Sequence, residues 1–535
     1  MSKDSSKCVL RLVTLAPVLA MILAAAAACG GATQTTAPET PSGPSGDVKR
    51  GGELTLARLE EPLTFDPVGP TDAGSAFLMD QVYDTLVKPD QTGAHLVPGL
   101  AKKWDISPDG LEYTFYLRSA KFSTGDPVTS EDVTFSLNRA ADAKISPLAF
   151  LFLNMDKIEA LGAKTVKITL KEPTTPFLSS LAVYAAGIVP KAVVEADPKG
   201  FGNKPVGSGP FMVEEYTRGD KVVLVPNPYC WELGVDGKPL PYLDKVTVKY
   251  VPETNSRMLG LRNGDFDVID NIPCAEAKSL GAEANISLHV DDIYKLDYIF
   301  INHQKPPFDN KAFRLALNYA TDRQAILDTV FFGYGQIANS YMPKMSFWDE
   351  GVKPIPYDPA KAKQYLEESG YDGKPIVIMV PAGDAPRKEI AQIVQQTWAS
   401  VGIKASILEL DGGTIWEKVV KGDYEVFVDY VISDINDDDE MATLHADYWA
   451  PGATHGYFSW YQNRETTDLV AKARKTPVSQ ERMGYYSQVQ KILYGDGYNV
   501  PLIFSPALTA CRDYVQNWRT LAEGWWWLDQ VWMKK

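Results

Sequence analysis

Histidine is scarce in this chain of 535 residues, and cysteine is equally rare. The five histidines are never three or four residues apart, so no helix can present two of them to one metal ion. They are His95, His289, His303, His445 and His455. No spacing of the cysteines resembles a zinc site. We therefore expect neither a metal centre nor a cofactor.

The motifs of common enzyme classes are missing as well. The sequence contains no Gly-x-Ser-x-Gly, phosphate loop, His-Glu-x-x-His or dinucleotide-binding fingerprint. We therefore predict a binding protein and not an enzyme. The remaining alternative is a secreted hydrolase that uses two clustered carboxylates as acid and base.

The chain has fewer basic than acidic residues, 53 against 68. The formal net charge is −15, and removal of residues 1–28 would make it −17. An acidic surface disfavours both nucleic acid and electrostatic binding to anionic lipid. We expect no nucleic-acid partner.

The N-terminus has the layout of a secretory signal. Lys3, Lys7 and Arg11 precede an apolar run over residues 12–28 that ends in small residues. The run has 17 residues, one of them proline, whereas a membrane-spanning helix needs roughly 20. We predict a signal peptide over residues 1–28 and export of the mature chain.

Cys29 directly follows these small residues and resembles the lipid-attachment cysteine of bacterial lipoproteins. That pattern prefers leucine where this sequence has Ala26, so ordinary cleavage is the alternative. The next twenty or so residues have almost no sizeable apolar side chain to offset the entropy of ordering. We predict lipid attachment at Cys29 and a flexible linker over residues 29–49.

Two strand-helix-strand units follow in the body of the chain. In the first, apolar and polar residues alternate over 245–250. Thr254 is placed to cap a helix that Gly264 ends, and residues 266–269 form the returning strand. The unit predicts part of a parallel sheet covered by helices.

In the second unit, an apolar strand over 376–380 leads into a helix over 386–401. Gly402 ends that helix before a strand over 403–410. Because more than 100 residues separate the two units, we assign them to different α/β lobes. Further signals predict a helix opened by a Thr129 and Asp132 capping box, a helix from Pro359 to Gly370, and strands over 113–117 and 166–170.

Two clusters of unusual composition have more than one interpretation. The acidic residues at 434–440 directly follow a predicted strand over 424–432. They form either a solvated loop or a strand-end binding site, because ligands of open α/β sheets lie beyond the carboxyl ends of strands. The tryptophans at 525–527 and Trp532 either pack a final strand against the core or form an aromatic platform for sugars.

Several segments, in order along nearly the whole mature chain, resemble the family 5 extracellular solute-binding proteins of ATP-driven importers. This group includes oligopeptide-, dipeptide- and nickel-binding proteins. The segments are 100–104, 109–118, 121–133, 205–211, 227–231, 241–244 and 307–309, with Asn302 and Arg314.

The resemblance implies an α/β fold of the periplasmic-binding-protein type II class (cluster C). Two lobes with mixed sheets and flanking helices close on a ligand, and a smaller domain is added. The first lobe is expected over 50–86, 204–287 and 501–535. The extra domain is expected over 87–203 and the second lobe over 288–500.

The resemblance also implies ligand-binding residues. Asp434 matches the aspartate that binds the ligand ammonium in peptide-binding members, although Val431 replaces their usual tryptophan. Arg387 is the nearest match to a residue that meets the ligand carboxylate, and a first-turn surface arginine is its alternative. Trp416 matches a pocket aromatic, with packing as its alternative.

Three further positions complete the expected site. Asp72 and Ala73 lie in a turn after the predicted strand over 53–57, where the first lobe meets ligand. Phe504 lies near the second crossing between the lobes.

We therefore expect a monomeric receptor on the outer side of the bacterial cytoplasmic membrane. It binds a short peptide or similar zwitterion and delivers it to the membrane permease of an importer. An oligosaccharide is the alternative ligand, because the chain has 12 Trp and 26 Tyr and lacks tryptophan at Val431. Nickel or a metal chelate is a third alternative, disfavoured by the scarcity of histidine.

Overall fold

The computed structural model describes residues 48–69, 72–90, 92–93, 95–450 and 458–534, without the side chain of Ala73. Residues 1–42 and 43–535 form separate units, and every described residue belongs to the second. The predicted signal peptide, Cys29 and the linker up to residue 47 lie outside the described residues. None of the described helices has the length and apolar character needed to cross a membrane.

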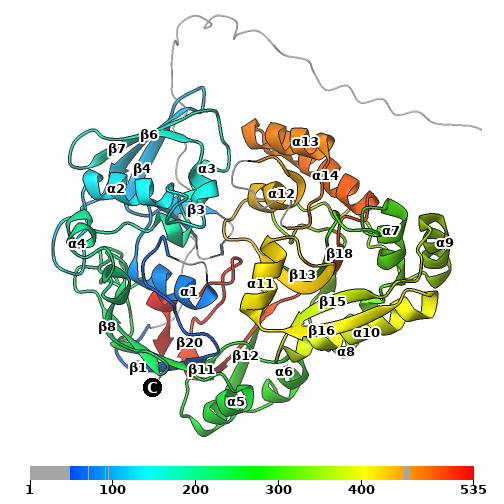
Figure 1. The fold of residues 1–535 in the computed structure, drawn as a ribbon. Helices are drawn as coiled ribbons and strands as arrows, with labels where there is room; N and C mark the ends of the chain where they lie inside the picture. Colours follow the sequence, from blue (N-terminus) through cyan, green and yellow to red (C-terminus); the bar gives the residue numbers. More distant parts are fainter. Residues whose placement is uncertain (1–47, 70–71, 91, 94, 451–457, 535) are drawn as a thin grey trace, which may run out of the picture. The chain divides into compact units, whose positions relative to one another are not determined.

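A seven-stranded mixed sheet has the strand order β12-β19-β11-β1-β10-β9-β8 (Figure 1). Its strands are β1 (Glu53–Arg58), β8 (Phe211–Thr217), β9 (Lys221–Pro226), β10 (Lys245–Tyr250), β11 (Val268–Ile269), β12 (Ile286–Asp291) and β19 (Ala507–Arg512). β1 pairs in parallel with both β10 and β11, so α5 (Thr254–Asn263) carries the chain across β1. The first predicted strand-helix-strand unit is confirmed.

The ends of α5 differ in how well they were predicted. Thr254 is not the cap, because Glu253 holds that position without a side-chain hydrogen bond. The Thr254 hydroxyl instead accepts a hydrogen bond from Arg257 Nη2 at 3.3 Å. Gly264 ends the helix at φ 83°, a left-handed conformation that costs glycine little.

A second, six-stranded sheet has the order β14-β18-β13-β17-β15-β16. Its strands are β13 (Lys295–Ile301), β14 (Gln336–Ile337), β15 (Ile376–Pro381), β16 (Ala405–Leu410), β17 (Val426–Ile432) and β18 (Val500–Phe504). β15 pairs in parallel with β16 and β17, and α10 (Ala385–Val401) covers them (Figure 1). This confirms the second predicted unit and its place in a different sheet.

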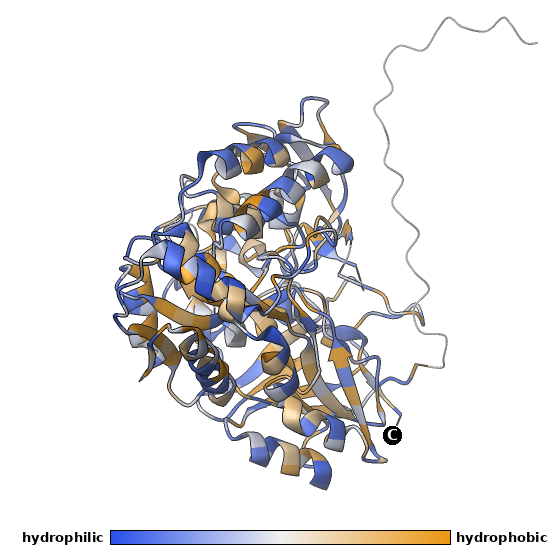
Figure 2. Cartoon of the chain, turned by 90° about the vertical axis from the view of Figure 1, so that its right-hand side faces the viewer, coloured by the Kyte–Doolittle hydropathy of each residue, from blue (hydrophilic) through white to orange (hydrophobic). Residues whose placement is uncertain are grey.

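Apolar clusters cover both faces of the six-stranded sheet, because side chains alternate along a strand. Leu296, Tyr298 and Phe300 of β13 join one cluster, and Ile299 and Ile301 join the other. The first cluster contains residues of α11 (Gly412–Val420), α12 (Asp439–Ala446), α13 (Arg464–Lys475) and α14 (Ser479–Gly495). The second contains residues of α7 (Lys311–Ala320), α8 (Arg323–Thr329), α9 (Pro359–Ser369) and α10. Figure 2 shows the resulting contrast between apolar strands and helices of mixed hydropathy.

A four-stranded antiparallel sheet, β4-β5-β7-β6, lies between β1 and β8 in the sequence. Its strands are β4 (Ala101–Ile106), β5 (Glu112–Leu117), β6 (Met155–Ala160) and β7 (Thr165–Leu170). The predicted capping box opens α2 (Ser130–Ala140): the Thr129 amide donates to Asp132 at 2.9 Å, and the Asp132 amide donates to Thr129 Oγ1 at 3.3 Å.

Shorter elements complete the described chain. They are α1 (Ala73–Val82), α3 (Phe177–Ser180), α4 (Lys191–Ala196), α6 (Cys274–Leu280), the pairs β2 (Val87–Pro89) with β3 (Leu96–Pro98) and β20 (Val515–Gln516) with β21 (Trp532–Met533), and 3-10 turns at Ala149–Phe152, Tyr184–Ala186, Phe201–Asn203 and Leu528–Gln530.

The chain passes between the two large sheets at two places. β12 and β13 belong to different sheets, as do β18 and β19, so the crossings lie at residues 292–294 and 505–506. The expected boundaries near 287 and 501 fall inside β12 and β18, so they lie a few residues before the two crossings.

Candidate functional site

A cavity of about 70 Å³ lies where α1, the loop after β17 and the C-terminal tail meet. Its lining is strongly acidic. The acidic lining residues are Asp80, Asp84, Glu232, Asp434, Glu523 and Asp529. Lys88 is the one basic residue among the described residues that line it. Such a concentration of negative charge in a partly enclosed space favours a cationic ligand group.

Asp434 enters this cavity from the loop after β17, and Glu440 fixes that loop. Glu440 Oε2 accepts hydrogen bonds from Ser433 Oγ (2.9 Å), the Asp434 amide (2.8 Å) and the Ile435 amide (3.2 Å). Burial raises the pKa of both carboxyl groups, and the charge of Asp434 raises the pKa of Glu440 further. A cation placed beside Asp434 would favour the ionised form of this pair.

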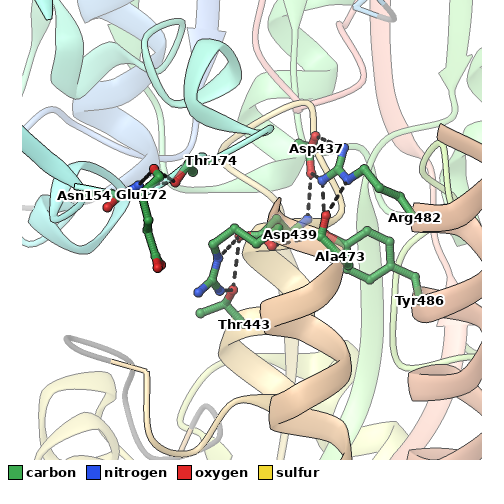
Figure 3. A network of polar contacts seen from close by, with 10 residues as sticks. Asn154, Glu172, Thr174, Asp437, Asp439, Thr443, Ala473, Arg482 and Tyr486 are labelled. Atoms are coloured by element: carbon green, nitrogen blue, oxygen red, sulfur yellow. Dashed lines mark hydrogen bonds and ion pairs between the residues drawn. The ribbon is translucent and has the colours of Figure 1, made fainter. Parts of the chain in front are cut away.

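The remaining acidic residues of this segment are structural, and Figure 3 shows two of them, Asp437 and Asp439, within a network of polar contacts. Arg482 binds both oxygens of Asp437, at 2.7 and 2.9 Å, and Arg474 binds Asp439 at 3.0 Å. Asp438 has the Phe347 amide as a donor at 3.0 Å, and burial beside Asp437 raises its pKa to about 8. The solvated-loop interpretation is therefore wrong, because the arginines that neutralise the segment come from α13 and α14.

The C-terminal tryptophans form a wall of the cavity that α1 holds in place. Gln81 Nε2 donates to the Trp526 carbonyl at 2.9 Å, and its Oε1 accepts from the Leu528 amide at 3.3 Å. Trp526 is buried against Phe77, with ring centroids 4.3 Å apart. Trp525 and Trp527 also line the cavity and are partly buried. All three consecutive tryptophans therefore line the cavity, and Trp526 also packs against α1.

Two of the cavity carboxylates, Glu232 and Asp84, have polar partners within the protein. Lys88 pairs with Glu232, and its ammonium lies 5.1 Å from the centre of the Trp527 ring. Asp84 accepts hydrogen bonds from Trp231 Nε1 and Ser208 Oγ, each at 2.8 Å. These carboxylates therefore have donors within the protein.

Asp80 and Glu523 also line the cavity, and the charge of Asp80 contributes to raising the pKa of Tyr184. Glu523 is 2% exposed, and neither of its carboxylate oxygens has a hydrogen-bond partner. Burial raises the pKa of Asp80 to about 8, with a contribution from Glu523, and raises the pKa of Glu523 to about 7. This pair could not be identified from the sequence, because neither residue lies in a recognisable motif.

Residues 95–449 match the profile described as bacterial extracellular solute-binding proteins, family 5 Middle. The chain belongs to this family. The glutathione-binding protein GsiB of Escherichia coli O1:K1 / APEC is 31% identical over 468 residues, which cover 86% of this chain and 90% of that protein.

Solved structures show the same relationship. The periplasmic binding protein DppA from Helicobacter pylori, in complex with peptide STSA, has a TM-score of 0.82 and 28% identity over 91% of this chain and 99% of its own. AgaA from A. tumefaciens R10, in complex with agropinic acid, has a TM-score of 0.81 and 26% identity over 90% of this chain and 99% of its own. The predicted family and the predicted two-lobed α/β fold class are confirmed.

Arg387 of this family 5 protein lies in the first turn of α10 and already has two acidic partners. Its guanidinium binds Asp384 at 2.5 Å and Asp429 at 2.7 Å, and lies 4.7 Å from the centre of the Tyr430 ring. It does not line the cavity. A ligand carboxylate would have to share Arg387 with these groups.

The other expected residues lie in varied surroundings, and Trp416, Phe504 and Asp72 do not line the cavity. Trp416 is 47% exposed and contacts Phe458 with its ring edge. Phe504 is buried against Trp348. Asp72 caps α1 by accepting from the Ser75 amide at 2.7 Å. Ala73 begins that helix, and its side chain lies outside the described part of the chain.

Proposed function

We propose that this protein is the receptor of an ATP-driven importer and that it binds a short peptide, or a similar zwitterion, through Asp434. The observation that carries the proposal is the position of the Asp434 carboxyl group, beyond the carboxyl end of β17 and in the wall of an acidic cavity. The naming of GsiB as a glutathione-binding protein and the peptide complex of DppA support a peptide ligand.

The geometry suits capture of an ammonium group. Three donors hold one oxygen of Glu440, so the loop keeps its shape when a ligand arrives. No basic partner of Asp434 is present among the described residues. Burial raises the pKa of Asp434, and its hydrogen bond with Glu440 lowers it. A ligand ammonium beside Asp434 would form charge-assisted hydrogen bonds with its carboxylate.

The remaining site residues are proposed at the margins of the ligand. Arg387 would bind the ligand carboxylate in place of Asp384, which is the more exposed of its two present partners. Trp416, Phe504, Asp72 and Ala73 would approach the ligand only with a change in the separation of the lobes.

We propose the division into lobes and extra domain given above, with crossings at residues 292–294 and 505–506.

We further propose that the protein is exported, acylated at Cys29 and held as a monomer outside the cytoplasmic membrane. The apolar run before Cys29 and the linker composition support this. Mass spectrometry of the mature N-terminus distinguishes an acylated cysteine from ordinary cleavage, which would leave a free N-terminus.

Isothermal titration calorimetry against short neutral peptides tests the ligand assignment. We expect saturable binding that Asp434→Asn weakens at least tenfold, because a hydrogen bond to a charged group contributes about 1.5–3 kcal/mol. Glu350→Gln is the matched control, because Glu350 is exposed and does not line the cavity. Absence of binding to any peptide, or equal binding by the Asp434→Asn variant, would refute the proposal.

A further inference from the structure

Two carboxylates of the cavity have no counter-charge within the described protein. Asp80 is on α1 and Glu523 is in the C-terminal tail, and both line the cavity. No hydrogen bond or ion pair of the Asp80 carboxylate is present among the described residues, and both oxygens of the buried Glu523 lack a partner. Charged groups with nearly complete burial are normally paired.

Three basic residues lie nearby. Lys88 is paired with Glu232. Arg519 lies 5.2 Å from the centre of the Trp527 ring, with Asp529 and Asp90 as its charged neighbours. Arg58 pairs with Asp270 at 3.5 Å and packs over the Phe77 and Trp526 rings. The charged groups that shift these two pKa values within the described part of the chain are acidic: Glu523 raises the pKa of Asp80, and Asp90 raises the pKa of Glu523.

The walls around these carboxylates are aromatic. Tyr184 and Trp525 line the same cavity, with ring centroids 6.2 Å apart and an edge-on geometry. Aromatic faces attract organic cations, and they attract the planar guanidinium group most readily by stacking. Among the described residues, no group of three histidine, cysteine or acidic side chains is arranged to hold a metal ion. An organic cation is therefore the occupant that fits both the charge and the walls.

We infer that Asp80 and Glu523 form a second cation-binding position and that the preferred ligand is a peptide with an arginine or lysine side chain. The terminal ammonium of that peptide binds at Asp434, and the basic side chain lies between Asp80, Glu523 and the Tyr184 and Trp525 rings. This inference rests on the proposed function, because it assigns the same cavity to a peptide.

The inference separates two roles of acidic side chains in the cavity. Asp434 recognises a group that every unmodified peptide carries, so it contributes to binding whatever the sequence of the ligand. Asp80 and Glu523 recognise a group that only basic peptides carry, so they determine selectivity. The decisive quantity is therefore the ratio of affinities for basic and neutral peptides of equal length.

Calorimetry at pH 7.5 with Ala-Ala, Ala-Arg, Arg-Ala and Ala-Glu measures this ratio directly. We expect at least one arginine dipeptide to bind tenfold or more tightly than Ala-Ala, and Ala-Glu to bind most weakly. Glu523→Gln should reduce the basic-to-neutral ratio at least tenfold, and Asp80→Asn should act in the same direction. Glu350→Gln removes one negative charge outside the cavity and should leave the ratio unchanged.

The outcomes distinguish the two proposals. If Ala-Ala binds as tightly as both arginine dipeptides, or if Glu523→Gln and Asp80→Asn leave the ratio unchanged, the second cation position is wrong and the peptide receptor stands. If no dipeptide or longer peptide binds to the wild-type protein, the proposed function fails, and the second position fails with it. Because two separate variants probe the position, misfolding of one does not remove the test.

Discussion

Two sets of buried carboxylates in this protein differ in whether the fold supplies a basic partner. Asp437 and Asp439 are neutralised by Arg482 and Arg474 from neighbouring helices. Asp80 and Glu523 are enclosed by aromatic residues and by other acids, with no basic partner among the described residues. Burying a charge without a partner is costly. Carboxylates of the first kind therefore hold the fold together, whereas the second kind leave charge available to a ligand.

The strongest test of this comparison is removal of a structural arginine. Arg482→Met leaves Asp437 buried without its bidentate partner and should lower the free energy of unfolding by about 3–5 kcal/mol. Urea denaturation measures this loss. Lys475→Met is the matched control, because Lys475 pairs with Glu172 at an exposed position and should cost less than about 1 kcal/mol. Equal and small losses in the two variants would show that Asp437 is not structural.

A second test replaces one carboxylate by an amide in each of the two regions. Asp437→Asn removes charge-assisted hydrogen bonds and should lower the free energy of unfolding by about 1–3 kcal/mol. Glu523→Gln removes a buried charge that has no partner and should raise the melting temperature of the ligand-free protein at pH 8. Thermal unfolding compares the two variants with the wild type. A shift of the melting temperature in the same direction in both variants would contradict the distinction between carboxylates that stabilise the fold and carboxylates left for a ligand.

A third test uses the pH dependence of stability. The folded pKa values of Asp80 and Glu523 are raised, to about 8 and about 7, above their ordinary values of 3.8 and 4.5. The folded state therefore binds more protons than the unfolded state between about pH 4 and 8, so these groups reduce stability progressively as the pH rises through that range.

A double variant, Asp80→Asn with Glu523→Gln, isolates this contribution from the other titrating groups. Its stability advantage over the wild type should be largest near pH 8 and should decline steadily toward pH 4. Urea denaturation at a series of pH values measures the difference. An advantage that does not change with pH would show that neither carboxyl group has a raised pKa in the folded protein.

Several elements follow from local sequence alone. The alternation over 245–250 and the apolar run over 376–380 predict β10 and β15, because a strand has a side-chain period of two or is buried on both faces. Gly264, Gly370 and Gly402 end helices as predicted, because each adopts a left-handed conformation there. The capping box at Thr129 needs contacts across only three residues. In each case the deciding interactions are short in sequence.

The candidate site was less accessible to prediction. Asp434 lines the cavity, whereas Arg387, Trp416, Asp72 and Phe504 do not. Local sequence does not show that Arg387 is engaged by Asp429, because Arg387 lies on α10 and Asp429 lies on β17. It also does not reveal the position of Trp416, whose side chain is half exposed.

The sequence by itself determined the family, the main strands and helices, and the expectation of a binding protein, because motifs and periodicity are properties of consecutive residues. Only the tertiary structure decided which carboxylates are neutralised. Asp437 meets Arg482 across 45 residues, and Gln81 holds Trp526 in the cavity wall across 445. Whether a buried acid stabilises the fold or is left for a ligand depends on such distant neighbours, because the free energy of a buried charge is set by its surroundings in space.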